Sequence, residues 1–255
     1  MSISLDEAVE LTRTGDVWVF RGRSVPDRAI QLTTNSPVNH VGMAVVLDDL
    51  PPLMWHAELG RSLPDMWTGT HQRGVQLHDL RDAVCVWANR YGQQAWLRQL
   101  EPPAGPAMED AVLRTVARLD GTPFPSTAQL AWRWLRGRAP AIPRPVLPGW
   151  SRPASLAADA KEQRGDARQL AAKEQPADLE GQLAGSEGPG AAPNRSLETA
   201  YCAEVVAVTY EAMGLLPPGR RPNWYDPGRF WSGDDLGLDA GATLGAEIEV
   251  RIPPR

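Results

Sequence analysis

The chain has 255 residues, a formal net charge of −5 at pH 7 and an isoelectric point near 5.4, which is enough length for one sizeable α/β or α+β domain. A net negative chain has no global basic field, so we exclude non-specific binding to nucleic acid. The N-terminal segment is acidic where a secretory signal needs a basic start, and no apolar run approaches the roughly 20 residues of a membrane span. We therefore predict a cytoplasmic protein without a membrane span.

The first hundred residues alternate between one short helix and several strands. Apolar spacing predicts a helix over residues 5–13 and a buried strand over 17–20. A strand at 40–47 and another at 54–59, separated by a turn rich in Asp and Pro, predict a hairpin. Short alternating segments between residues 74 and 100 predict further sheet, with Cys85 in the middle of a strand.

The second half of the chain contains helices on either side of a low-complexity stretch. Helical spacing appears at 108–119 and again at 127–135. Residues 151–196 have no large apolar side chain except leucine, and such a stretch cannot offset its ordering entropy by burial, so we predict a flexible insertion. Beyond it, apolar spacing predicts a helix that ends at Gly214, and a last strand closes the chain.

Cys202 lies at the predicted start of that late helix. Helix N-termini carry unpaired N–H groups and a partial positive charge, which favour a thiolate and can hold an oxyanion. Cys202 is therefore a candidate nucleophile, although a small buried hydrophobic residue is the commoner fate of a lone cysteine.

The early hairpin offers a base for this nucleophile. If its turn centres near Asp48, paired residue numbers sum to about 96, so His40 lies opposite His56 on the same face. A register shifted by two pairs His40 with Glu58 instead. In either register His40 gains a polar neighbour that can hold its tautomer, as a general base requires.

Four segments together resemble a known family. The runs GDVWVFRG, IQLTTNSPVNHVGMAVV, LMWHAEL and, much later, YCAEVVAVTYEAMGLL are similar to the circularly permuted NlpC-type cysteine peptidases, in particular the YiiX-like branch. The resemblance implies an α+β permuted papain-like fold, an antiparallel sheet packed on helices. It also implies one catalytic domain in two parts, 1–150 and 197–255, around the flexible insertion 151–196.

The resemblance also implies the roles of the site residues. The nucleophile falls on Cys202, the base on His40 and the third polar residue on His56, with Glu58 as the alternative. A thiolate and imidazolium pair would then perform acyl transfer on a peptide, amide or lipid ester. Gln31 is a candidate oxyanion donor, Tyr201 a candidate pocket residue, and no cofactor or metal is implied.

Two other functions compete with this one. His56 and Glu58 match the first half of a zinc deaminase signature, but its second half, PCxxC, is missing, and we interpret His71 and His78 as surface histidines. A non-catalytic scaffold of the same fold, binding a lipid or a peptide, is the other alternative. The sequence leaves the substrate and the oligomeric state undetermined.

Overall fold

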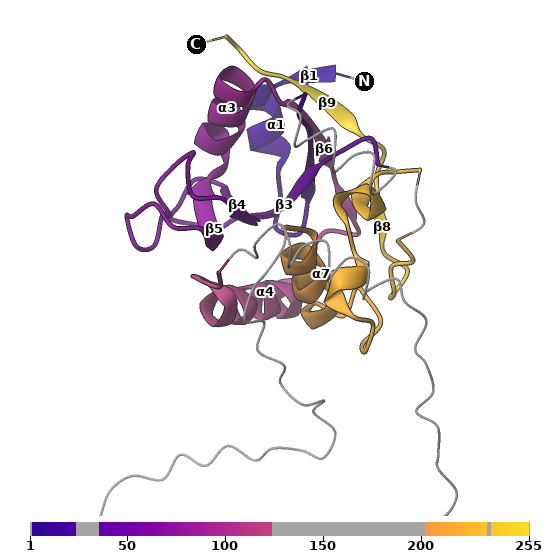
Figure 1. Cartoon of the computed structure of the whole chain (residues 1–255). Helices are drawn as coiled ribbons and strands as arrows, with labels where there is room; N and C mark the ends of the chain where they lie inside the picture. The colour runs from indigo at the N-terminus through magenta and orange to yellow at the C-terminus, as the bar shows by residue number, and fades with distance from the viewer. Residues whose placement is uncertain (1, 24–35, 124–201, 234–235, 255) are drawn as a thin grey trace, which may run out of the picture. The chain divides into compact units, whose positions relative to one another are not determined.

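A seven-stranded sheet forms the centre of the computed structural model, which describes residues 2–23, 36–123, 202–233 and 236–254 (Figure 1). The strand order is β1-β9-β6-β2-β3-β4-β5. The strands are β1 (Ser2–Ser4), β2 (Val17–Arg21), β3 (His40–Val45), β4 (Leu53–Glu58), β5 (Gly74–Asp79), β6 (Gln94–Arg98) and β9 (Ile248–Arg251). All neighbours are antiparallel except β1 and β9, which are parallel. The fold is therefore α+β, and the sheet is mixed where an antiparallel sheet was predicted, because β1 pairs in parallel with β9.

Helices cover both faces of this sheet. One face carries α1 (Leu5–Leu11) and α3 (Leu80–Tyr91), and the other carries α4 (Pro106–Leu119) and α7 (Cys202–Ala212), as Figure 1 shows. Two 3-10 turns, η1 (Pro222–Trp224) and η2 (Pro227–Phe230), and a small second sheet of β7 (Leu100–Glu101) and β8 (Thr243–Leu244) complete the described elements. The alternating side chains of β2 and β3 divide between these two cores, Val17 and Met43 on the α7 side and Trp18 and Ala44 on the α3 side.

Helix α3 replaces a strand that we predicted at residues 83–91. Its buried positions include Leu80, Ala83, Val84 and Trp87, which are spaced three and four residues apart, as one helix face requires. The Asp79 carboxylate caps the helix by accepting the Asp82 N–H, and Gly92 ends it in the left-handed conformation. Cys85 is therefore a buried helical residue rather than the centre of a strand.

Most of the other predicted elements agree with the structure. Helices α1 and α4, strands β2 to β5 and β9, and the end of α7 near Gly214 lie where the sequence patterns place them. The predicted helix at 127–135 and the insertion at 151–196 lie outside the described residues. In the described ranges, no helix combines the length and apolarity that crossing a bilayer requires.

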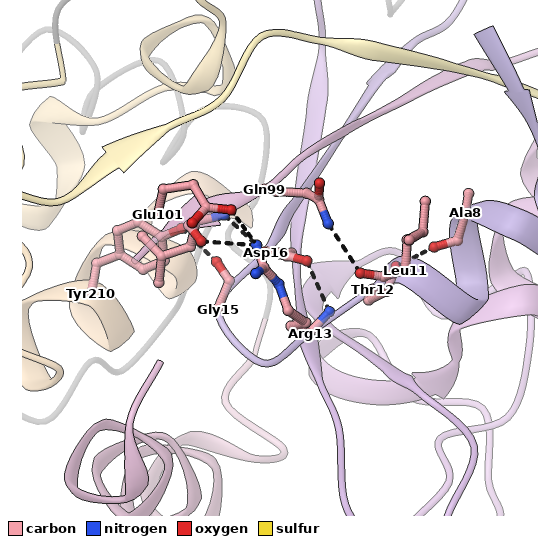
Figure 2. Close-up of polar contacts among 10 residues, drawn as sticks. Ala8, Leu11, Thr12, Arg13, Gly15, Asp16, Gln99, Glu101 and Tyr210 are labelled. Atoms are coloured by element: carbon pink, nitrogen blue, oxygen red, sulfur yellow. Dashed lines mark hydrogen bonds and ion pairs between the residues drawn. The ribbon is translucent and has the colours of Figure 1, made fainter. Parts of the chain in front are cut away.

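Helix α7 is bound to the sheet by polar contacts as well as by apolar packing. The Trp55 indole N–H donates to the Thr209 hydroxyl (3.1 Å), and the Tyr210 hydroxyl donates to the carbonyl of Gly15 (2.6 Å). The second contact joins α7 to the turn before β2, which Figure 2 shows. These bonds hold the C-terminal half of α7 against β4 and the turn before β2.

Asp16 organises that turn from a buried position. One carboxylate oxygen accepts the Arg13 N–H and the other accepts the Leu100 N–H, both at 2.8 Å (Figure 2). Burial raises the pKa of this carboxyl to about 6, although the two N–H donors and the Arg13 charge act in the opposite direction.

We expect Asp16→Asn to lower the free energy of unfolding by about 1–3 kcal/mol at pH 7, because the amide NH₂ would face a backbone N–H and leave that donor unpaired. Urea unfolding followed by circular dichroism measures this loss. The matched control is Asp49→Asn in the exposed β3–β4 turn, which should change stability by less than about 0.5 kcal/mol. Equal stability of the two variants would contradict the assigned role of Asp16.

Candidate active site

Cys202 is the first residue of α7, and its side chain is almost completely buried, with 1% exposed. The backbone N–H groups of Val41 and Ala203 hydrogen-bond to its sulfur. Val41 is the second residue of β3 and follows His40 directly. The late helix start and the early hairpin, about 160 residues apart in the sequence, therefore meet in the structure.

His40 is the first residue of β3, and its ring contacts aromatic side chains and another histidine. The ring stacks edge-on to Trp87 of α3 (centroids 5.0 Å apart) and lies tilted against Phe20 of β2 (5.8 Å). Its Nε2 atom is 3.2 Å from Nδ1 of His56, within hydrogen-bond distance. His40 therefore has the polar neighbour that a general base needs.

The β3–β4 register explains how this contact arises. Met43 pairs with Trp55 and Val45 with Leu53, so paired residue numbers sum to 98 rather than 96. Continued to the strand ends, this register sets Gly42 opposite His56, which agrees with the second of the two predicted registers. His56 then reaches His40 along a diagonal of the sheet, and Gly42 leaves room because a Cβ atom there would collide with Met54 and crowd His56.

Glu58, the alternative third residue, points its carboxylate elsewhere. It accepts a hydrogen bond from the Ser62 hydroxyl (2.6 Å) and another from the Trp87 side chain. Burial raises its pKa, and these hydrogen bonds partly oppose that shift. His56, not Glu58, is thus the hydrogen-bond partner of the His40 ring.

The hydrogen-bonded chain continues beyond His56 to residues that we did not predict as part of the site. His56 Nε2 lies 3.1 Å from His78 Nδ1, and His78 Nε2 lies 3.2 Å from the side-chain oxygen of Gln76. The side chains of His56, His78 and Gln76 are completely buried, so the prediction that His78 is a surface histidine was wrong. Register accounts for the cluster, because His56 pairs directly with Gln76 and Met54 with His78 across β4 and β5.

Burial favours the neutral forms of the three histidines and of the Cys202 thiol at pH 7. Burial lowers the pKa of His40 and of His78 to about 4, and it lowers the pKa of His56 well below its usual value. Burial likewise raises the pKa of the Cys202 thiol to about 12, despite the stabilising backbone N–H groups. The resting thiolate and imidazolium pair that the family resemblance implies is therefore not favoured here.

The Cys202 thiol belongs to the core on the α7 side of the sheet, whereas the His40 ring contacts Phe20 and Trp87 of the core on the α3 side. In the part of the chain that the structure describes, no hydrogen bond joins the Cys202 sulfur to the His40 ring, whose Nε2 is engaged with His56. Gln31 and Tyr201, the predicted oxyanion and pocket residues, lie outside the described residues. Among the described residues, no group of three or more His, Cys, Asp or Glu side chains is arranged to hold a metal ion.

Comparisons with known proteins find similarity among solved structures. No family model and no curated protein matches the chain. Among solved structures, it is similar to the metalloprotein YiiX from Escherichia coli O157:H7, with 21% sequence identity and a TM-score of 0.36. The similarity covers 48% of this chain and 56% of the other, so this chain spans little more than half the length of that protein.

Proposed function

We propose that the protein is a cysteine-dependent hydrolase or acyltransferase of permuted papain-like, NlpC-type fold. In this proposal Cys202 attacks an amide or an ester, and His40, oriented by His56, is the base. The observation that supports it is the position of the thiol at a helix N-terminus, hydrogen-bonded to the N–H of the residue that follows His40. A nucleophile, a base and an orienting group held by separate rigid elements are the components of covalent acyl transfer.

The protonation states determine how the reaction would begin. Because the resting thiol is neutral, its proton must leave as sulfur attacks the substrate carbonyl. Since Nε2 of His40 is engaged with His56, Nδ1 is the atom that accepts this proton. The carbonyl oxygen becomes an oxyanion near the backbone N–H groups at the start of α7.

Collapse of the tetrahedral species then releases the leaving group, which takes the proton back from His40 Nδ1. An acyl group remains in thioester linkage to Cys202. Attack by water completes hydrolysis, whereas attack by an alcohol or an amine completes acyl transfer. In either case His40 removes the proton of the attacking group, and the thiol is regenerated.

The competing function is a non-catalytic scaffold that binds a lipid or a peptide. The burial of the Cys202 thiol and its pKa of about 12 favour this alternative, because an inert core cysteine has the same properties.

Acylation selectivity separates the two functions, and Cys85 provides a second buried thiol within the same chain. We expect p-nitrophenyl acetate to acylate Cys202 faster than Cys85 at pH 7, because the proposal assigns His40 as the base of Cys202, whose sulfur hydrogen-bonds to the N–H of the adjacent Val41. Peptide mass spectrometry measures both sites in one sample. The His40→Ala variant should lose this preference. Equal acylation of both cysteines in the wild-type chain would favour the scaffold.

A further inference from the structure

Four buried or partly buried polar side chains form one continuous hydrogen-bonded row across β3, β4 and β5. The row runs from His40 to His56 (3.2 Å), to His78 (3.1 Å) and to the side-chain oxygen of Gln76 (3.2 Å). His56 and His78 each use one ring nitrogen for each of their two neighbours, and His40 uses Nε2 for its one neighbour in the row. The direction in which the N–H groups point along the row therefore decides which nitrogen of His40 is left bare.

Gln76 sets that direction at one end. Its amide nitrogen donates to two backbone carbonyls, those of Gln72 (3.1 Å) and Gly74 (3.3 Å). Carbonyl oxygens only accept hydrogen bonds, so the amide cannot turn its oxygen toward them. The Gln76 oxygen must therefore face His78, and His78 must present an N–H at Nε2.

The remaining positions follow from His78. A neutral imidazole has one N–H donor and one acceptor nitrogen, and burial keeps these three rings neutral. If His78 carries its proton on Nε2, its Nδ1 accepts from Nε2 of His56. By the same step, Nδ1 of His56 accepts from Nε2 of His40. The His40 proton is then on Nε2, and Nδ1 keeps a free lone pair.

We propose that Gln76 and His78 are positioning residues that fix the tautomers of all three imidazoles and so keep Nδ1 of His40 bare as the proton acceptor. The tautomers follow from the hydrogen bonds of the three neutral, buried rings. The use of the bare nitrogen as a base rests on the proposed function. The backbone carbonyls of Gln72 and Gly74, which orient the Gln76 amide, thus set which nitrogen of the His40 ring carries the proton.

The other groups around the row do not reverse its direction. Trp87 and Phe20 present aromatic rings to His40, and Trp87 also packs on His56. Burial lowers the pKa of His78 most, the Asp65 charge and a hydrogen bond with the Leu63 backbone raise it, and the nearby His71 lowers it. A His78 ring turned toward the Leu63 carbonyl through Nδ1–H would leave a bare Nε2 against the Gln76 oxygen, and two acceptors would then face each other.

The same row stabilises the cation that forms on His40. When Nδ1 accepts the thiol proton, no atom leaves the ring, and the positive charge is shared between both N–H groups. Nε2–H then donates to the lone pair of His56, which the rest of the row already polarises toward His40. If the hydrogen bonds ran in the opposite direction, His56 would present an N–H to His40. That N–H would repel the cation, and Nδ1 of His40 would already carry the proton.

Nitrogen NMR of the histidine rings tests the proposal without any substrate. In the full-length chain labelled with ring-¹⁵N histidine, two-bond ¹H–¹⁵N spectra distinguish the Nδ1–H tautomer, the Nε2–H tautomer and the imidazolium. The chain has four histidines, and exposed His71 is the internal reference. We expect His40, His56 and His78 all to be single Nε2–H tautomers at pH 7. A Nδ1–H tautomer at any of these three residues would overturn the proposal.

A pair of glutamine variants tests the origin of the direction. Gln76→Met removes the group that orients His78, and we expect mixed tautomers in the row. Gln72→Met is the matched control, since its amide donates to the Val75 carbonyl and contacts no ring, and it should keep the wild-type spectrum. An unchanged spectrum of a folded Gln76→Met protein, or the same change in both variants, would overturn the role of Gln76. If Gln76→Met does not fold, the wild-type spectrum alone decides.

The failure of this inference is distinct from the failure of the proposed function. Correct tautomers without selective acylation of Cys202 would leave the inference standing and remove the catalytic proposal. Selective acylation of Cys202 together with a Nδ1–H tautomer at His40 would remove the inference and leave the catalytic proposal standing.

Discussion

Replacement of Cys202 by alanine is expected to reduce hydrolysis of an activated ester by at least about 10³-fold, because no other described residue can carry the acyl group at this position. His40→Ala should cause a loss of about 10²–10⁴-fold, since the neutral thiol then has no base to take its proton. Release of p-nitrophenol from its acetate ester by each purified, folded variant measures both effects.

The double variant provides a sharper result than either single variant. If sulfur and imidazole act in one step, Cys202→Ala with His40→Ala should be about as slow as Cys202→Ala alone, because residues that act as a unit are not additive. Cys85→Ala is the matched control, a small buried cysteine on the opposite core, and it should retain activity. Losses that multiply in the double variant would contradict a shared step.

The second large effect concerns acid stability. The pKa of His78 falls from 6.5 in the unfolded chain to about 4 in the folded protein, because burial disfavours the charged ring. A group with a depressed pKa contributes stability above its unfolded pKa and loses it as the pH falls toward its folded pKa. For His78 this loss amounts to about 3 kcal/mol between pH 6.5 and pH 4.

Other buried groups titrate in the same range, so the comparison must be made against a variant. The raised pKa of Asp16, about 6, adds stability as the pH falls, which is opposite in sign to the histidines. His78→Gln removes one titrating ring and leaves Asp16 unchanged. We expect this variant to be less stable than the wild type at pH 7 and to recover by about 3 kcal/mol relative to it by pH 4.

Urea unfolding at intervals from pH 7 to pH 4 measures that difference. The matched control is His71→Gln, which removes an imidazole at an exposed position outside the hydrogen-bonded row. A constant difference for His78→Gln would mean that the His78 ring is not held neutral by burial.

Local sequence patterns predicted most strands of the sheet, but they missed helix α3 and strand β1. The apolar runs of β2, β3 and β4 have the composition of buried strands, and turn residues mark their ends. Helix α3 was missed because Ala83, Val84 and Cys85 read as a short apolar strand. Its face is visible only when the window extends to Leu80 and Trp87. Strand β1 has three residues, and its partner β9 lies at the other end of the chain, so no local pattern predicts it.

The candidate site was likewise predicted only in part. His40 and His56 could be predicted together because a short hairpin joins their strands, and a register error of two residues did not separate them. His78 could not, since the long β4–β5 connection hides the pairing that sets it diagonally beside His56. A polar residue alternating with apolar ones in a strand usually faces solvent. In β5 the face that holds Gln76 and His78 is buried instead, and the two side chains hydrogen-bond to each other and to His56.

The contact between Cys202 and β3 depends on tertiary packing. Nothing in the sequence spacing fixes where α7 crosses the sheet, and the crossing follows from Tyr210 and Thr209, which hydrogen-bond to the β1–β2 region and to β4. The protonation states were equally hidden, because desolvation depends on how completely the thiol and rings are buried.

The pH dependence of Cys202 acylation by p-nitrophenyl acetate tests most directly whether a neutral thiol passes its proton to His40. With His40 as base, the rate should depend on the pKa of that ring, about 4, and so stay nearly level from pH 6 to pH 9. A rate that rises about tenfold per pH unit across this range would show attack by free thiolate, for which the imidazole is not needed, and would contradict the account.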